Sequence, residues 1–229
     1  MEDKMIRVAI THGDTNGIGY EVILKTFATP TILELCTPIV YGSPKLVAYH
    51  RKALNLETSF NIIERAEDAC DGKLNILACF DDEVKVDLGQ PSEEAGKAAL
   101  MALDRAMTDY RSGLYDILVT APINKATIQG EGFHFPGHTE YIETCVGEGN
   151  KALMILMNED LRVALVTTHL PIRNVAEAIT QEAIVEKASI FNLSLKRDFR
   201  ISSPRIAVLS LNPHAGDNGL LGNEEKDII

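Results

Sequence analysis

Short apolar runs rich in β-branched residues alternate along this chain with longer stretches in which apolar residues recur every three or four positions. Most of the short runs are continuously apolar, which predicts strands that are buried on both faces. Six such strands are expected, at 6–11, 73–80, 116–120, 152–157, 161–168 and 205–211. Strands separated by helical stretches are typical of a parallel sheet covered by helices, so the pattern predicts an α/β fold.

Two long helices are predicted from apolar spacing. In the stretch 92–110 the apolar positions recur at steps of four and three, and Ser92 is placed to cap the first turn. In the stretch 180–199 one apolar stripe is followed by basic residues near the C-terminal end. The stripes are expected in the core, and they consist of Gly96, Leu100, Leu103, Met107 and Tyr110 in the first helix and Ile184, Ala188, Phe191 and Leu195 in the second. Residues 223–229 read as the opening of a further amphipathic helix.

The segment 129–137 is rich in glycine and is the best candidate for a boundary between two lobes. We therefore expect a first α/β lobe at 1–130 and a second at 131–229. No internal repeat, low-complexity tract or flexible linker is evident.

Charge and composition argue against two classes of function, nucleic-acid binding and membrane association. The 229 residues carry a formal net charge of −11, which argues against a nucleic-acid partner because such binding depends on clustered Lys and Arg. No apolar stretch approaches the roughly 20 residues needed to cross a bilayer, so no membrane association is expected. The four cysteines lack CxxC spacing, and the N-terminus lacks the basic start and long apolar region of a signal peptide. We therefore interpret the sequence as that of a cytoplasmic protein whose cysteines are reduced thiols.

Polar clusters follow three of the expected strands. They contain Lys125 in the run TAPINK, His169 in TTHLP and His214 in LNPHAG. Because ligands bind outside the carboxyl ends of parallel strands, these side chains are expected at one rim of the sheet. The pattern predicts a ligand site there.

Two imidazoles at one rim suggest a divalent metal, since neutral histidine nitrogen is a good ligand for zinc, manganese, cobalt or nickel. His169 and His214 are 45 positions apart and have no local metal signature such as HExxH. The alternative interpretation is that each histidine caps a strand-to-loop turn by bonding to the backbone. The two interpretations stay open on the residues alone.

The run Phe135–Glu140, with the letters FPGHTE, places an imidazole and a hydroxyl at a predicted helix start. Backbone N–H groups and the helix dipole favour an anion there, so His138 and Thr139 could hold a phosphate or carboxylate that faces the metal. A plain N-terminal cap by either residue is the alternative.

The run Gly13–Gly19, with the letters GDTNGIG, joins the first strand to a helix but matches neither GxGxxG nor GxxxxGK[ST]. Tight packing of strand against helix is its expected role, and Asp14 is a candidate for supporting a ligand site. His12 is ambiguous, whereas His50 and His134 are expected at the surface or in loops.

The motifs together resemble the 4-hydroxythreonine-4-phosphate dehydrogenase family. Residues 11–21 resemble its T-x-G-D-P-x-G-I-G-P-E signature, with Thr15 and Tyr20 in place of the usual prolines, and GHTE, TTHLP and LNPHAG match in the same order. The resemblance implies that His138 and Thr139 bind substrate and that His169 and His214 bind a divalent metal, which would be Zn, Mg, Mn or Co. It further implies a two-lobed, three-layer α/β/α fold similar to isopropylmalate dehydrogenase, and a homodimer with shared active sites.

The activity that the resemblance implies is the NAD- or NADP-dependent oxidation of 4-phosphooxy-L-threonine, followed by decarboxylation, in vitamin B6 biosynthesis. Lys125 is a candidate for proton transfer, and a structural ion pair is the alternative. Two other hypotheses are a related dehydrogenase of 4-phosphoerythronate or 4-phosphothreonate, and a non-catalytic fragment. The family's third metal ligand lies in a later H-D-Q-G motif that these 229 residues lack, so the chain alone is expected to be inactive, with its C-terminal part missing.

Overall fold

The computed structural model describes residues 5–80, 84–130 and 132–229. The chain divides into two units, and the division falls after Glu148. We call residues up to Glu148 the first unit and residues from Gly149 onward the second unit. Each is considered by itself.

The first unit is built on a five-stranded sheet in which every neighbouring pair is parallel. The strands are β1 (Arg7–Thr11), β2 (Thr37–Gly42), β3 (Asn61–Ile63), β4 (Asn75–Ala78) and β5 (Ile117–Thr120), in the spatial order β3-β4-β2-β1-β5. This arrangement confirms the predicted α/β class. The strands expected at 6–11, 73–80 and 116–120 correspond to β1, β4 and β5, while β2 and β3 were not predicted.

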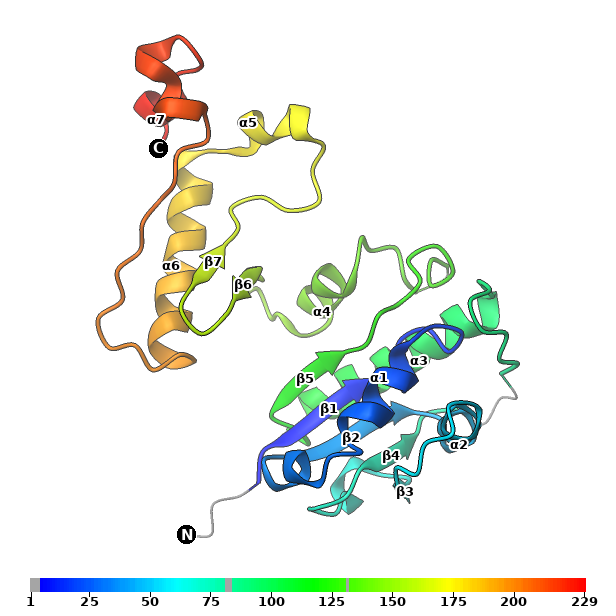
Figure 1. Cartoon of the computed structure of the whole chain (residues 1–229). Helices are drawn as coiled ribbons and strands as arrows, with labels where there is room; N and C mark the ends of the chain where they lie inside the picture. The colour runs from blue at the N-terminus through cyan, green and yellow to red at the C-terminus, as the bar shows by residue number, and fades with distance from the viewer. Residues whose placement is uncertain (1–4, 81–83, 131) are drawn as a thin grey trace. The chain divides into compact units, whose positions relative to one another are not determined.

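Helices cover both faces of this sheet, which makes three layers (Figure 1). On one face, α1 (Gly19–Thr26) and α2 (Pro44–Ala53) pack against Ile10, Val40 and Ile76 of the central strands. On the other, α3 (Glu93–Arg111) and α4 (His138–Val146) pack against the alternate strand positions, which include Ile39 and Leu77. Two short 3-10 helices, Pro30–Glu34 and Ala66–Asp68, lie in the connections.

Helix α3 confirms the first predicted helix and its cap. The Ser92 hydroxyl accepts a hydrogen bond from the backbone N–H of Ala95 at 3.1 Å, and the buried stripe contains Gly96, Leu103 and Met107. Tyr110 was expected in that stripe but is 47% exposed. Alanines at 95, 98, 99, 102 and 106 supply most of the remaining buried surface, because small side chains let the helix lie close to the sheet.

The second unit contains a two-stranded sheet and one long helix. Strand β6 (Ile155–Met157) pairs antiparallel with β7 (Arg162–Ala164), and α6 (Gln181–Arg197) begins at Thr180, whose hydroxyl accepts from the N–H of Ala183 at 3.1 Å. The other elements are short, namely the 3-10 helices Ile172–Asn174 and Pro213–Gly219, α5 (Val175–Ala178) and α7 (Glu224–Asp227). Helices α6 and α7 confirm the helices predicted in this half.

Two expectations for the second unit were wrong. The strands expected at 152–157 and 161–168 are antiparallel, because a tight turn joins them: the N–H of Leu161 donates to the Asn158 side chain at 2.7 Å. A parallel pair needs a crossover of about a dozen residues or more. The strand expected at 205–211 is absent from the described structure, and its apolar residues Val208 and Leu209 are 52% and 79% exposed.

The lobe boundary also differs from the predicted one between residues 130 and 131. The segment that follows residue 131 packs on the first unit, since Phe133 and Tyr141 belong to the same core as α3. The division after Glu148 therefore leaves α4 with the five-stranded sheet. Across the described residues no helix has the length and apolarity to span a membrane, and the four cysteines are free thiols.

Candidate functional site

The order of strands creates a switch point between β1 and β5. The chain leaves β1 through α1 to β2 on one side, and α3 later returns it to β5 on the other side of β1. In open α/β sheets, ligands bind outside the carboxyl ends of strands at such a point. The loops that follow β1 and β5 are therefore the place to look for chemistry in the first unit.

The loop after β1 and the loop after β5 are in contact at Gly13. The N–H of Asp14 donates to the Pro122 carbonyl at 2.9 Å, and a Cβ on Gly13 would lie 2.3 Å from the same oxygen. A Cβ on Gly19 would lie 2.1 Å from the carbonyl oxygen of His12. The glycines thus permit close packing of the chain on its own backbone, as the sequence predicted, and this loop does not fit a dinucleotide phosphate cradle.

Asn16 was not predicted to have a role, yet its side chain both donates and accepts hydrogen bonds with the segment that precedes α3. Its Nδ2 donates to the Gln90 carbonyl at 2.8 Å, and its Oδ1 accepts from the N–H of Asp87 at 2.9 Å. The backbone N–H of Asn16 donates to the Asp14 carboxylate at 2.9 Å. Asn16 therefore holds the segment before α3 against the first loop and fixes Asp14, and no sequence motif would have revealed this.

A buried aromatic stack lies beneath the same loop. The rings of His12 and Tyr20 are stacked with centroids 5.0 Å apart, and His50 lies 5.0 Å from Tyr20. Nε2 of His12 is 3.3 Å from the Ala98 carbonyl oxygen, and Nε2 of His50 is 2.9 Å from that of Thr15. His50 was expected at the surface and is only 2% exposed, because α2 turns it inward; His134 is exposed, as expected.

Acid is expected to destabilise the first unit through His12. Burial is the main cause that lowers the pKa of His12 from 6.5 to about 4, so the unfolded chain takes up the proton first as pH falls. This contribution to stability is complete above pH 6.5 and is lost as pH falls to about 4, with a total of about 3 kcal/mol. Urea unfolding across this range should show a shallower pH dependence for His12→Gln than for the exposed control His134→Gln. Equal slopes would contradict the assignment to His12.

His138 and Thr139 form the first turn of α4, as the sequence predicted. The cap residue Gly137 has no side chain to satisfy the N–H groups of that turn, and Nε2 of His138 is buried with no hydrogen-bond partner in the described structure. Burial and then the charge of Lys125 lower the pKa of His138, which favours a neutral imidazole. The first turn of α4 thus combines backbone N–H groups, a buried imidazole nitrogen and the carboxylate of Glu140.

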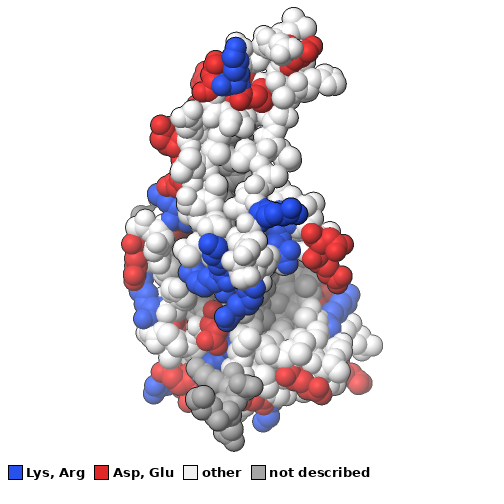
Figure 2. Space-filling model, turned by 90° about the vertical axis from the view of Figure 1, so that its left-hand side faces the viewer, with Lys and Arg blue, Asp and Glu red and all other residues white. Residues whose placement is uncertain are grey.

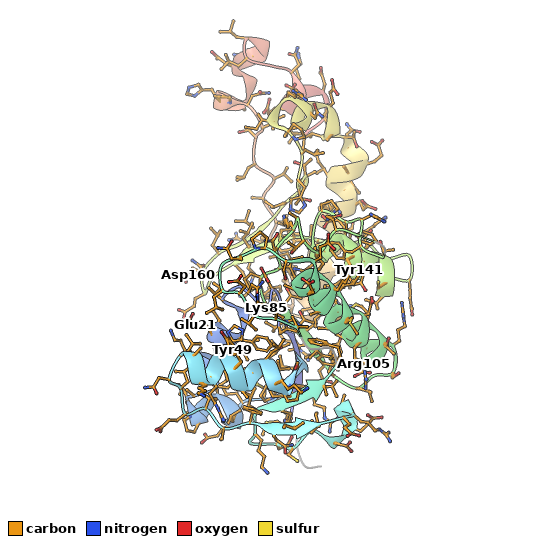
Figure 3. All side chains as sticks on the ribbon, turned by 90° about the vertical axis from the view of Figure 1, so that its right-hand side faces the viewer. Glu21, Tyr49, Lys85, Arg105, Tyr141 and Asp160 are labelled. Carbon is orange, nitrogen blue, oxygen red and sulfur yellow. The ribbon has the colours of Figure 1, made fainter. Side chains whose placement is uncertain are left out.

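Helix α4 is anchored on α3 (Figure 3). The hydroxyl of Tyr141 donates to the carboxylate of Asp104, and a guanidinium N–H of Arg111 donates to the Cys145 carbonyl at 2.6 Å. The ring of Tyr141 also stacks on Phe133, with centroids 5.2 Å apart. These contacts fix the position of the first turn of α4 relative to the sheet.

His169 and His214 are both exposed, and both have a backbone φ in the left-handed region, at 55° and 53°. Such a φ costs energy in a residue other than glycine, and strained backbone of this kind clusters at ligand sites. His169 follows β7, but no strand precedes His214, so the inference that both lie at the carboxyl ends of parallel strands was wrong. Two imidazoles fit the donor chemistry of a divalent metal, and the described residues show no cluster of three His, Cys, Asp or Glu side chains.

The turn that carries His214 is tied to the last helix. Asn212 Nδ2 donates to the Glu224 carboxylate at 2.7 Å, and Asn212 N–H donates to Glu225 at 2.5 Å. Acidic and basic side chains of α7 stand together at the top of Figure 2, where charges of both signs are interspersed over the face shown. The carboxylates of Glu224 and Glu225, which follow the left-handed turn in the sequence, therefore hold Asn212, the residue that precedes it.

A hollow of about 520 Å³ lies at the other edge of the first unit's sheet. Its lining includes Asn61 and Leu74, at the amino ends of β3 and β4, together with Phe27 and Phe60. It is thus remote from the carboxyl ends of β1 and β5 and does not coincide with the anion donors of α4.

Comparison with known proteins gives consistent matches. The sequence profile of the family described as pyridoxal phosphate biosynthetic protein PdxA matches residues 34–229, a range that begins after the first loop. A 4-hydroxythreonine-4-phosphate dehydrogenase of Bacteroides thetaiotaomicron is 64% identical over 229 residues, which are 100% of this chain and 63% of the relative. One from Sulfurihydrogenibium is 37% identical over 98% of this chain and 69% of its own length.

Solved structures agree with the fold. A 4-hydroxythreonine-4-phosphate dehydrogenase from Klebsiella pneumoniae superposes with a TM-score of 0.83 at 28% identity, covering 100% of this chain and 69% of that one. One from Burkholderia phymatum gives 0.81 at 33% identity, over 99% of this chain and 68% of that one. The chain thus spans about two thirds of the length of these proteins, and 63% of the Bacteroides relative.

Proposed function

Because this chain belongs to the pyridoxal phosphate biosynthetic protein PdxA family, we propose that the protein is an NAD- or NADP-dependent oxidoreductase of pyridoxal phosphate biosynthesis. Its proposed substrate is 4-phosphooxy-L-threonine. The observation that carries this proposal is the identity with a 4-hydroxythreonine-4-phosphate dehydrogenase along the whole chain. A cytoplasmic homodimer with shared active sites is part of the proposal.

In the proposed reaction, a hydride passes from the alcohol carbon of the substrate to the nicotinamide, and the alcohol proton is released. The resulting β-keto acid loses carbon dioxide and yields 3-amino-2-oxopropyl phosphate. His169 and His214 would hold a divalent metal, which supplies Lewis acidity toward the alcohol oxygen. His138 and Thr139 would bind the substrate through the buried imidazole nitrogen and the backbone N–H groups of the first turn of α4.

A substrate panel tests the proposal. The purified product of the complete gene would be supplied with NAD or NADP, a divalent metal, and either 4-phosphooxy-L-threonine, 4-phosphoerythronate or 4-phosphothreonate. The highest kcat/KM is expected with 4-phosphooxy-L-threonine, and removal of metal by a chelator should abolish turnover. A higher kcat/KM with either of the other acids would reassign the substrate, and no reduction of either nucleotide with any of them would refute the activity.

The 229 residues alone are proposed to be inactive, because two histidines fall short of the three protein ligands usual at catalytic zinc sites. The same assay on residues 1–229 tests this point, with the complete gene product as the control. Turnover by residues 1–229 at a rate comparable to the complete product would contradict it.

A further inference from the structure

One row of side chains crosses all five strands of the first unit's sheet, on the face that α1 and α2 cover. The strand register aligns its members, which are Ile62, Ile76, Val40, Ile10 and Val119 in order from β3 to β5. The three central residues are 5% exposed or less, whereas Ile62 is 58% exposed and Val119 is 47% exposed. Helices α1 and α2 therefore cover the middle of this face and leave its two edges exposed.

The exposed region at β5, an edge strand of the sheet (Figure 1), extends onto α1. Ile117, two residues before Val119, points to the same face of the sheet and is 48% exposed. A Cβ on Gly19 would lie 3.2 Å from the Cβ of Ala121, so this flank of α1 faces the end of β5. Val22 follows Gly19 by three residues on the same flank and is 50% exposed. We call Val22, Ile117 and Val119 the β5 shelf.

The two edge strands differ in how they are protected from further contacts. Natural sheets guard their edges with short strands and with charged or proline side chains. Strand β3 has only three residues and begins with Asn61, whose amide donates to the Asn75 side chain at 3.1 Å. Strand β5 has the letters ILVT, without charge or proline, and the Asp116 carboxylate before it accepts from the N–H of Arg7 on β1 at 2.8 Å. The edge at β5 thus has the character of a surface that becomes covered.

The length of the relatives indicates what can cover the shelf. Parallel sheets occur almost only with both faces covered by helices. These 229 residues match 63% of the Bacteroides relative, so more than a third of that protein lies outside the match. A second copy of the chain is the alternative occupant. The shelf continues the layer that α1 and α2 already form on this face, which favours a helix of the same polypeptide.

We propose that the β5 shelf is the docking surface for a helix from the part of the complete gene product that lies outside residues 1–229. The helix lies beside α1 and presents aliphatic side chains to Val22, Ile117 and Val119. It continues the helical layer over β5, the strand whose carboxyl end leads into the loop at the switch point. The proposal concerns the assembly of the polypeptide and does not depend on the proposed substrate.

Cysteines placed in the row of side chains test the proposal by thiol labelling. Val119→Cys, Ile62→Cys and Val40→Cys would each be treated with a maleimide under native conditions, and mass spectrometry would follow labelling of the peptide that contains the new cysteine. In the complete gene product, Val119→Cys should be labelled at least about tenfold more slowly than Ile62→Cys, because the docked helix must open first. In residues 1–229 the two rates should agree within about twofold, since both thiols are accessible. Val40→Cys, at the buried centre of the row, should be slow in both proteins and shows that the sheet is folded.

Three results would overturn the proposal. Equal labelling of Val119→Cys and Ile62→Cys in the complete gene product would mean that the shelf stays open, and this comparison stands without residues 1–229. Slow labelling of Val119→Cys in residues 1–229 would place the cover within those residues. Protection in the complete product that disappears on dilution to the monomer would assign the cover to a second copy. The readout needs no turnover, so its failure is distinguishable from a failure in the substrate panel.

Discussion

Replacing His214 with alanine is expected to weaken divalent-metal binding by the complete gene product by more than about 100-fold. Loss of an outer-shell partner of a metal ligand already costs about 10- to 100-fold, and loss of a ligand itself should cost more. His169→Ala should give a loss of similar size, and kcat should fall with metal occupancy. Equilibrium dialysis with zinc or cobalt measures the affinity.

The double variant distinguishes a shared metal from two separate sites. If His169 and His214 bind the same ion, removal of the second imidazole should add much less than removal of the first, because sites that act together are not additive. His134→Ala, which removes another exposed imidazole, is the control. Two small and additive losses would contradict a shared metal.

Asp109→Ala is expected to lower the free energy of unfolding by about 2 kcal/mol, the cost of leaving the buried Tyr41 hydroxyl without its hydrogen-bond acceptor. The Asp109 carboxylate accepts from the Tyr41 hydroxyl at 2.9 Å and from Arg105 Nε at 3.1 Å, and its side chain is 6% exposed. Figure 3 labels Arg105 on α3. Without Asp109, a buried hydroxyl loses its partner.

A double-mutant cycle with Tyr41→Phe identifies the mechanism. Tyr41→Phe alone should cost about 1 kcal/mol, whereas in the Asp109→Ala background it should cost almost nothing, because the hydrogen bond is already absent. Urea unfolding of the four proteins gives the coupling. A full cost of Tyr41→Phe in both backgrounds would show that the bond does not contribute.

The sequence predicted the elements of the first unit where apolar runs were long. Strand β2 was missed because Pro38 interrupts its apolar run, although all six of its residues are buried. Strand β3 has only three residues and begins with a polar one, Asn61. In the second unit, the turn at Asn158 decided the pairing of β6 and β7, and hydrophobic periodicity alone does not report which way two strands run.

The sequence motifs predicted which residues belong to the candidate site, but not the contacts that position them. The motifs pointed to His138, Thr139, His169 and His214, and the helix start at His138 is confirmed. The packing of the loop after β5 on α3 depends on Gly96, since a Cβ there would lie 2.0 Å from the Thr127 carbonyl oxygen. The clamp by Asn16 depends on backbone groups more than 70 positions away. Contacts of this kind join segments that no local pattern connects.

The pairing of His169 and His214 on one metal is the claim on which the proposed chemistry most depends. Anomalous X-ray diffraction from crystals of the complete gene product grown with zinc or cobalt tests it most directly. We predict one anomalous peak bonded to a ring nitrogen of each histidine at about 2.0–2.1 Å. Imidazoles more than about 10 Å apart, or a peak bonded to neither of them, would contradict the assignment.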